Sequence, residues 1–123
     1  MFLVCLTMQI GDALDGSGEY LDPGRVNVPG RSYAFSAIVE GTVRIKLSHY
    51  SNSADTSDAR VMKNDVLVQE WSTNANSPVA RSVDVAIERG DLITIQHRSR
   101  ASDEQGFISQ VFVCADQFLI VGF

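Results

Sequence analysis

The chain has little of what nucleic-acid-binding and membrane proteins need. Only two of its ten basic residues are lysines, and the formal net charge is −5 with a pI near 4.8. Non-specific nucleic-acid binding needs an electrostatic attraction that such a chain lacks, so we expect no nucleic-acid partner. No run approaches the ~20 apolar residues of a membrane helix, so we also expect no membrane insertion.

Cysteine is scarce as well. Cys5 and Cys114 are the only two, and they lie far apart in the sequence. Disulfide scaffolds usually carry more cysteines, so we predict that both are reduced and buried. The apolar run Met1–Leu6 has no basic residue before it and ends too early for a signal peptide. We interpret it as the first strand of a protein made inside the cell.

The length and composition predict one ordinary globular domain. The chain has 123 residues, 45% hydrophobic and 20% charged, which is enough to bury a core without staples. Residues 1–24 hold the first strand and an acidic, glycine-rich arm. Residues 25–123 are predicted to form the domain itself.

Alternation of apolar and polar residues dominates the chain after residue 24. Such a period of two is typical of half-buried antiparallel strands. It is clearest at Val43–Leu47, at Val83–Ile87 and at Ile93–Ile95. In the last of these, Thr94 and Gln96 alternate with the isoleucines, so we predict that both face solvent.

Turn residues separate the strands. Asn64-Asp65 indicates a hairpin, because both residue types tolerate positive φ, and Arg89-Gly90-Asp91 indicates another turn. Ser51–Asp58 and Ser72–Ser77 are small and polar, as loop tips are. With about nine short strands and no convincing helix, we predict an all-β fold, a single antiparallel β-sandwich of jelly-roll type.

Two groups of residues are weak candidates for metal sites. His49 and His97 each end an inward-facing alternation, so both rings could meet at one rim of the sandwich, as a metal or acid–base pair or as structural histidines. Zinc needs three or four ligands, which favours the structural interpretation. The acidic arm Asp12–Asp22 could supply oxygens to calcium, but its spacing does not fit an EF-hand. We expect no metal and no cofactor.

Catalytic motifs are missing from the sequence. No G-x-S-x-G elbow is present, and no serine or cysteine carries a recognisable nucleophile motif. Paired carboxylates for glycoside hydrolysis are defined by a separation in space that the sequence does not show. We expect a protein that is not an enzyme.

Three polar or aromatic residues are candidates for recognition. Tyrosine, tryptophan and arginine supply much of the contact energy of binding surfaces. Tyr50 shares the outer face of its strand with Arg44 and Lys46, so Tyr50 and Arg98 are our candidate ligand contacts. Trp71, the single tryptophan, is more typical of a core residue.

The last residues are apolar on both faces of a predicted strand, Phe118–Val121. Phe118, Leu119, Ile120 and Phe123 therefore suggest either a doubly buried strand or a subunit interface. We favour a homo-oligomer, with this run lying beside the apolar run Phe2–Leu6.

Three segments resemble a known protein module: Gly41–Ser51, Arg60–Thr73 and Val79–Arg98. They are similar to the β-sandwich modules at the outer ends of tail-tip and tail-fibre proteins of tailed bacteriophages. The resemblance implies a trimer among other virion proteins, located in a virion assembled in the host cytoplasm, with a host glycan or receptor as a further partner. It implies a non-enzymatic role in host attachment.

Two alternatives to the tail role stay open. The first is a capsid decoration or head-fibre protein. The second, from another class, is a stand-alone carbohydrate-binding module, which needs an exposed aromatic platform; only Tyr50 is expected to be exposed.

Overall fold

Nine antiparallel strands make up the regular structure of the residues that the computed structural model describes, which are 4–7, 20, 32–38, 40–51, 56–99, 106–115 and 120–121. None of these residues forms a helix that could cross a membrane. The strands are β1 (Val4–Thr7), β2 (Ser32–Ala37), β3 (Gly41–Ser51), β4 (Ser57–Lys63), β5 (Val66–Thr73), β6 (Val79–Ile87), β7 (Leu92–Ser99), β8 (Gly106–Ala115) and β9 (Ile120–Val121).

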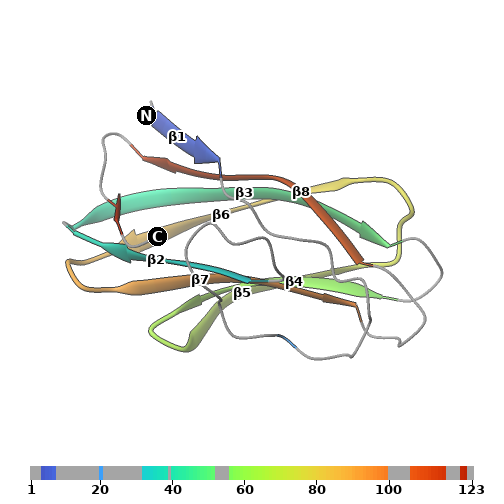
Figure 1. Cartoon of the computed structure of the whole chain (residues 1–123), viewed down its shortest axis with the longest axis horizontal. Coiled ribbons are helices and arrows are strands. Elements are labelled where there is room, and N and C mark those ends of the chain that lie inside the picture. Colours follow the sequence, from blue (N-terminus) through green and yellow to red (C-terminus); the bar gives the residue numbers. More distant parts are fainter. Residues whose placement is uncertain are drawn as a thin grey trace.

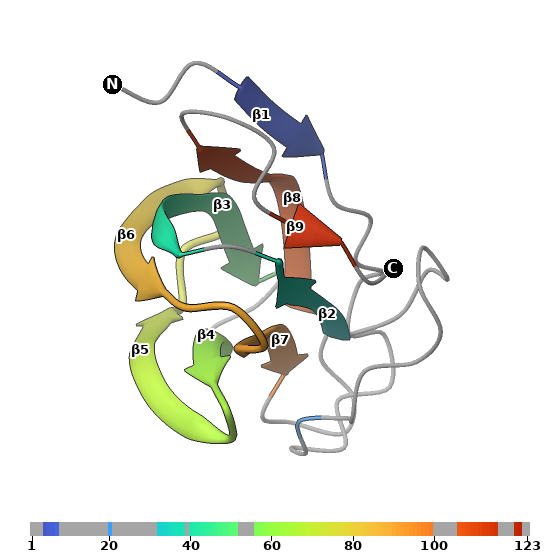
Figure 2. The ribbon, with the colours of Figure 1, turned by 90° about the vertical axis from the view of Figure 1, so that its left-hand side faces the viewer.

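The strands form two sheets that pack face to face (Figure 1). The first sheet has the order β1-β8-β3-β6 and the second has the order β5-β4-β7-β2-β9. At one margin β5 of the second sheet lies beside β6 of the first (Figure 2). The predicted all-β sandwich is therefore confirmed.

The core lies between the sheets and follows the alternation in the sequence. The alternating apolar residues Val43, Ile45 and Leu47 of β3 and Ile93 and Ile95 of β7 are fully or almost fully buried. Trp71 of β5 is partly buried and packs against this core, as expected. The prediction of a solvent-facing side is wrong for β7, because Thr94 and Gln96 are also buried. β7 is a central strand between β4 and β2, so neighbouring strands flank its outward side chains on both sides.

The predicted turns are present. Asn64 and Asp65 take φ values of 51° and 65° and join β4 to β5. The Asn64 side chain also bridges to the turn before β7, because its Oδ1 accepts the Leu92 N–H at 2.8 Å. Gly90 takes a φ of 92° in that turn, a conformation that side chains rarely adopt.

The prediction for the cysteines is wrong. Cys5 and Cys114 form a disulfide, and only Cys114 is buried. The two residues are direct partners in the antiparallel pairing of β1 with β8, which brings together positions 109 residues apart in the sequence. Two cysteines placed opposite each other on neighbouring strands are within disulfide reach, whatever their separation along the chain.

The predicted arrangement of the terminal runs is also wrong. β1 pairs with β8 in the first sheet, whereas β9 pairs with β2 in the second. The two runs thus belong to different sheets. The proposed loop at Ser51–Asp58 is shorter than expected, because Ser57 and Asp58 begin β4 and are buried there. The expected boundary at residue 24 lies outside the described residues.

Candidate functional site

The two histidines are buried. His49 of β3 and His97 of β7 are both fully inaccessible to solvent, which favours the structural interpretation. The partner of His97 Nε2 is the Ser57 hydroxyl at 2.8 Å, and that of His49 Nε2 is the Arg81 guanidinium at 3.0 Å. The described residues contain no group of three or more side chains that could hold a metal ion.

His49 is held as a neutral imidazole. Its Nε2 accepts the Arg81 Nε–H, so the ring proton resides on Nδ1, which has no hydrogen-bond partner among the described residues. Burial and the positive charge of Arg81 lower the pKa of His49 to about 4, and the carboxylate of Asp58 opposes them. A residue in this state supports the core rather than acid–base chemistry at neutral pH.

The candidate ligand contacts lie on opposite sides of the molecule. Tyr50 shares the outward face of β3 with Arg44 and Lys46, as predicted, and is half-buried there. Arg98 extends from β7 in the other sheet, beside β4. The structure therefore separates the two residues.

The other sequence-based candidates lie outside what the structure describes. Of the C-terminal interface residues, only the backbone of Ile120 is described, where it pairs with Ala37. Phe118, Leu119 and Phe123, and the acidic arm apart from Tyr20, are not described. The C-terminal interface and the expectation that the acidic arm holds no calcium stay predictions.

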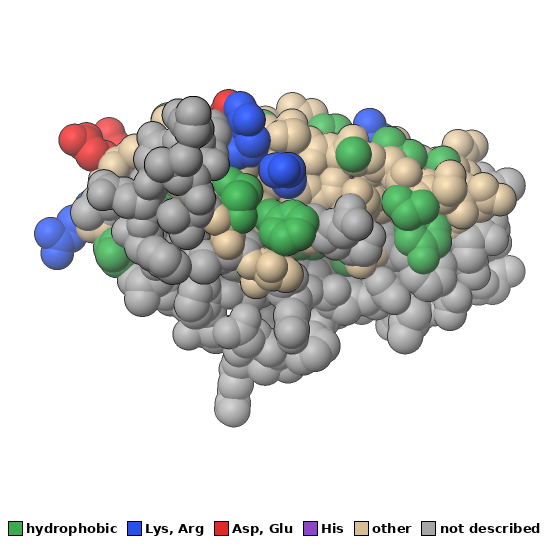
Figure 3. All heavy atoms as spheres, turned by 90° about the horizontal axis from the view of Figure 1, so that it is seen from above, with side chains coloured by type: hydrophobic (Ala, Val, Ile, Leu, Met, Phe, Trp, Pro, Cys, Tyr) green, Lys and Arg blue, Asp and Glu red, His purple; other side chains and the backbone are tan. Residues whose placement is uncertain are grey.

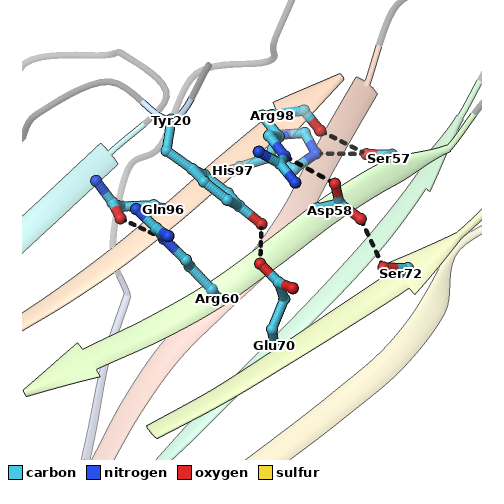
Figure 4. A network of polar contacts seen from close by, with 9 residues as sticks. All are labelled: Tyr20, Ser57, Asp58, Arg60, Glu70, Ser72, Gln96, His97 and Arg98. Atoms are coloured by element: carbon cyan, nitrogen blue, oxygen red, sulfur yellow. Dashed lines mark hydrogen bonds and ion pairs between the residues drawn. The ribbon is translucent and has the colours of Figure 1, made fainter. Parts of the chain in front are cut away.

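Around Arg98, the outer face of the second sheet carries a polar network (Figure 4). Asp58 of β4 is fully buried and accepts bonds on both carboxylate oxygens. Arg98 Nε donates to one oxygen at 2.7 Å and the Ser72 hydroxyl donates to the other at 2.6 Å. The antiparallel register places Asp58 directly opposite both partners, so the strands themselves position the three side chains.

Tyr20 completes this network from a distant part of the sequence. Its ring lies between two guanidinium groups, with the Cζ atoms of Arg60 and Arg98 at 3.8 and 4.3 Å from the ring centroid (Figure 4). Its hydroxyl donates to Glu70 Oε2 at 2.8 Å. Burial raises the pKa of Tyr20 well above its usual range, and the bond to Glu70 acts in the same direction, so the hydroxyl keeps its proton.

Gln96 of β7 extends the network along the sheet. Its side-chain oxygen accepts the Arg60 Nε–H at 2.7 Å. We call the six residues the Tyr20 cluster: Tyr20, Asp58, Arg60, Glu70, Gln96 and Arg98. Donors and acceptors thus alternate on rigid strands beside one aromatic ring.

The Tyr20 cluster has the chemistry of recognition rather than of catalysis. Glycoside hydrolysis needs two carboxyl groups that are free to exchange protons with the substrate. Asp58 does not meet this need, because it is fully buried and both of its oxygens are engaged. Guanidinium, carboxylate, amide and phenol groups instead provide directional donors and acceptors for a polar ligand.

Sequence reasoning found one member of the Tyr20 cluster, Arg98, and missed the others. The alternation of β4 and β5 does place Arg60 and Glu70 on the outward face, opposite the core positions of Val61 and Trp71. Nothing in the sequence shows that Tyr20 reaches these strands, because fifty residues separate it from Glu70.

Comparison with known proteins gives a likeness of fold. No protein-family model matches the chain, and no curated protein matches it. A family 35 carbohydrate-binding module from Cellvibrio japonicus matches with a TM-score of 0.55 and 14% identity, covering 97% of each chain. A family 36 module (CBM36-1) of a multidomain xylanase, from the hindgut metagenome of Trinervitermes trinervoides, matches with a TM-score of 0.52 and 14% identity. That match covers 83% of this chain and 94% of the module.

These matches overturn the resemblance to bacteriophage modules. The two matched structures are carbohydrate-binding modules and not phage proteins, so the expected tail-tip or tail-fibre role is wrong. The decoration and head-fibre alternative rested on the same resemblance. The expected location in a virion stays untested.

Proposed function

We propose that this protein is a non-catalytic carbohydrate-binding module whose ligand contacts the Tyr20 cluster. The observation that carries the proposal is the aromatic ring held between two arginines beside an exposed carboxylate. The sandwich fold, which is that of the matched modules, is compatible with this role.

The geometry suits a sugar for two reasons. A sugar ring presents hydroxyl groups that both donate and accept, and the Tyr20 cluster offers Glu70 as an acceptor and two guanidinium groups as donors. These side chains are also pre-positioned by their bonds to one another, which lowers the entropy cost of binding a small polar ligand.

The disulfide supports a location outside the reducing cytosol. Bonds such as Cys5–Cys114 persist in oxidising compartments and at cell surfaces. Extracellular or cell-surface polysaccharide is therefore the ligand source that we propose.

Binding to an array of plant, bacterial and animal glycans, with xylotriose and cellotriose as soluble probes, tests the proposal. The wild-type protein should bind glycans of at least one class on the array. Tyr20→Ala and Arg60→Gln should each weaken that binding about tenfold, the effect of removing one aromatic or guanidinium contact. Isothermal titration gives the affinities, and thermal unfolding confirms that each variant is folded.

Matched controls come from the other sheet. Arg44→Gln and Tyr50→Ala change the same residue types on the outward face of β3 and should leave the affinity unchanged. Loss of binding in Tyr50→Ala alone would move the site to the first sheet. A folded wild-type protein that binds no glycan on the array would refute the function.

A further inference from the structure

The outer face of the first sheet carries a small hollow that the Tyr20 cluster does not use. It has a volume of about 160 Å³ and lies on β3, β6 and β8. Figure 3 views the molecule from the side of this sheet, where basic side chains lie next to apolar ones near the middle of the described surface. Its lining residues are Lys46, Leu47, Ser48, Ala80, Arg81 and Phe112.

The register of the strands explains why the hollow exists. Ser48 lies opposite Ala80 of β6, so two small residues meet at the centre of the face. Lys46 lies opposite Phe112 of β8, and these two longer side chains stand next to the small pair. A register shift between Lys46 and Ser48 adds one residue on β8 at the same place.

Lys46, the charged residue of the hollow, differs from Arg44 on the same strand in its ion pairing. Arg44, two residues before Lys46, is paired with Asp84 through two bonds of 2.7 and 3.0 Å. Lys46 faces Ser82 and Phe112 across the sheet and forms no ion pair with another described residue. Its ammonium group is therefore available to a ligand in the hollow, beside an aromatic ring and a serine.

We infer that this hollow is a second carbohydrate subsite, which holds a single pyranose residue. The inference rests on the proposed function and adds a binding face opposite the Tyr20 cluster. The C–H face of a sugar ring packs on an aromatic side chain, here Phe112. Sugar hydroxyls accept from Lys46 and exchange bonds with the Ser48 hydroxyl.

The size of the hollow limits the ligand. Pockets for drug-sized ligands are ~300–1,000 Å³, so about 160 Å³ suits one ring and not a chain segment buried on all sides. A site of this size binds weakly by itself.

Filling the hollow tests the inference without removing any of its groups. Ala80→Tyr places a ring over the small centre, and the matched control Ala86→Tyr makes the same change on the same exposed face of β6, six residues along. Titration of methyl β-D-xylopyranoside and methyl β-D-glucopyranoside is followed by amide chemical shifts in ¹H–¹⁵N spectra. The wild-type protein and Ala86→Tyr should show shifts at Lys46, Ser48 and Ala80, and Ala80→Tyr should lose them at Lys46 and Ser48.

Each other result has a defined meaning. Shifts confined to Arg60, Glu70 and Arg98, unchanged in Ala80→Tyr, would refute the second subsite and leave the proposed function intact. Shifts at Lys46 with sodium acetate but not with either sugar would identify an anion site instead and overturn the inference. Shifts at the hollow with no response at the Tyr20 cluster would support the subsite and count against the proposed function's main site.

Discussion

At the scale of single residues, the buried imidazole of His49 makes stability depend on pH. The pKa of His49 is about 4 in the folded protein and near 6.5 in the unfolded chain, so the unfolded chain binds the proton first as the pH falls. The contribution of neutral His49 to the free energy of unfolding is therefore fully present above pH 6.5. As the pH falls from 6.5 to 4, the free energy of unfolding declines by up to about 1.4 kcal/mol per pH unit. Denaturant unfolding between pH 7 and pH 4 measures this decline.

The His49 prediction has a direct spectroscopic check. The imidazole C–H resonances of His49 should titrate with a midpoint near pH 4. In His49→Gln the stability loss between pH 6.5 and 4 should be smaller by the same amount. A midpoint near 6.5 in the folded protein would contradict the neutral, arginine-bonded state.

Arg98 compensates a fully buried carboxylate, and its loss should be costly. In Arg98→Met the charge of Asp58 stays buried with its main cationic partner removed. Breaking a pair of this kind costs about 3 kcal/mol or more. Urea unfolding at neutral pH gives the value.

A double variant distinguishes the effect of the Asp58–Arg98 ion pair from the effect of lost side-chain packing. Asp58→Asn combined with Arg98→Met removes both charges, so its free energy of unfolding should recover most of the loss. The matched pair on the other sheet, Arg44 with Asp84, is solvent-exposed, and Arg44→Met should change stability little. Equal losses in Arg98→Met and in the double variant would show that packing, not charge, dominates.

At the scale of elements, the disulfide attaches an edge strand to the sandwich. Among the described strands β1 pairs only with β8, and the bond closes a loop with a sequence separation of 109 residues. A loop of that length corresponds to about 4–5 kcal/mol of stabilisation in the chain-entropy account. Reduction with dithiothreitol, or the variant Cys5→Ser/Cys114→Ser, should lower the free energy of unfolding by that order.

Hydrogen exchange locates the effect within the fold. In the reduced protein the amides of β1 should exchange much faster, because an edge strand of four residues has few other contacts, whereas β3 and β7 should stay protected. A reduced protein with unchanged stability and unchanged exchange in β1 would show that strand pairing alone holds β1 in place.

At the scale of the whole molecule, the remaining sequence-based prediction is self-association. The sequence Phe118–Phe123 is apolar throughout apart from one glycine, and β5 at the other edge of the second sheet exposes Val66 by 67% and Leu67 by 53%. Exposed apolar edge strands pair with other chains unless they are covered. We therefore expect a mass that is a multiple of 13.4 kDa by light scattering.

The deletion of Leu119–Phe123 distinguishes the two edges. A monomer after the deletion assigns the interface to the C-terminal run, and an unchanged oligomer assigns it to β5. A wild-type monomer at all concentrations would contradict self-association and would leave the C-terminal run as part of the sheet edge that β9 forms beside β2.

The sequence by itself determined the fold class, most of the strands and the turns. Alternation at Val43–Leu47 and Ile93–Ile95 reflects a local property, because successive side chains of a strand point to opposite faces. Asn64-Asp65 marks its hairpin because these residue types tolerate positive φ. Both signals are present in a few consecutive residues, so no knowledge of distant contacts is needed.

Only the tertiary structure decided which strands are neighbours, and the candidate site depends on that. Cys5 meets Cys114 because β1 pairs with β8, and the Tyr20 ring lies between Arg60 of β4 and Arg98 of β7. Pairing of distant strands depends on the burial of the whole core and on loop closure, which no short window of sequence records. For the same reason Tyr50 and Arg98, which the sequence predicted as ligand contacts together, lie on opposite faces of the molecule.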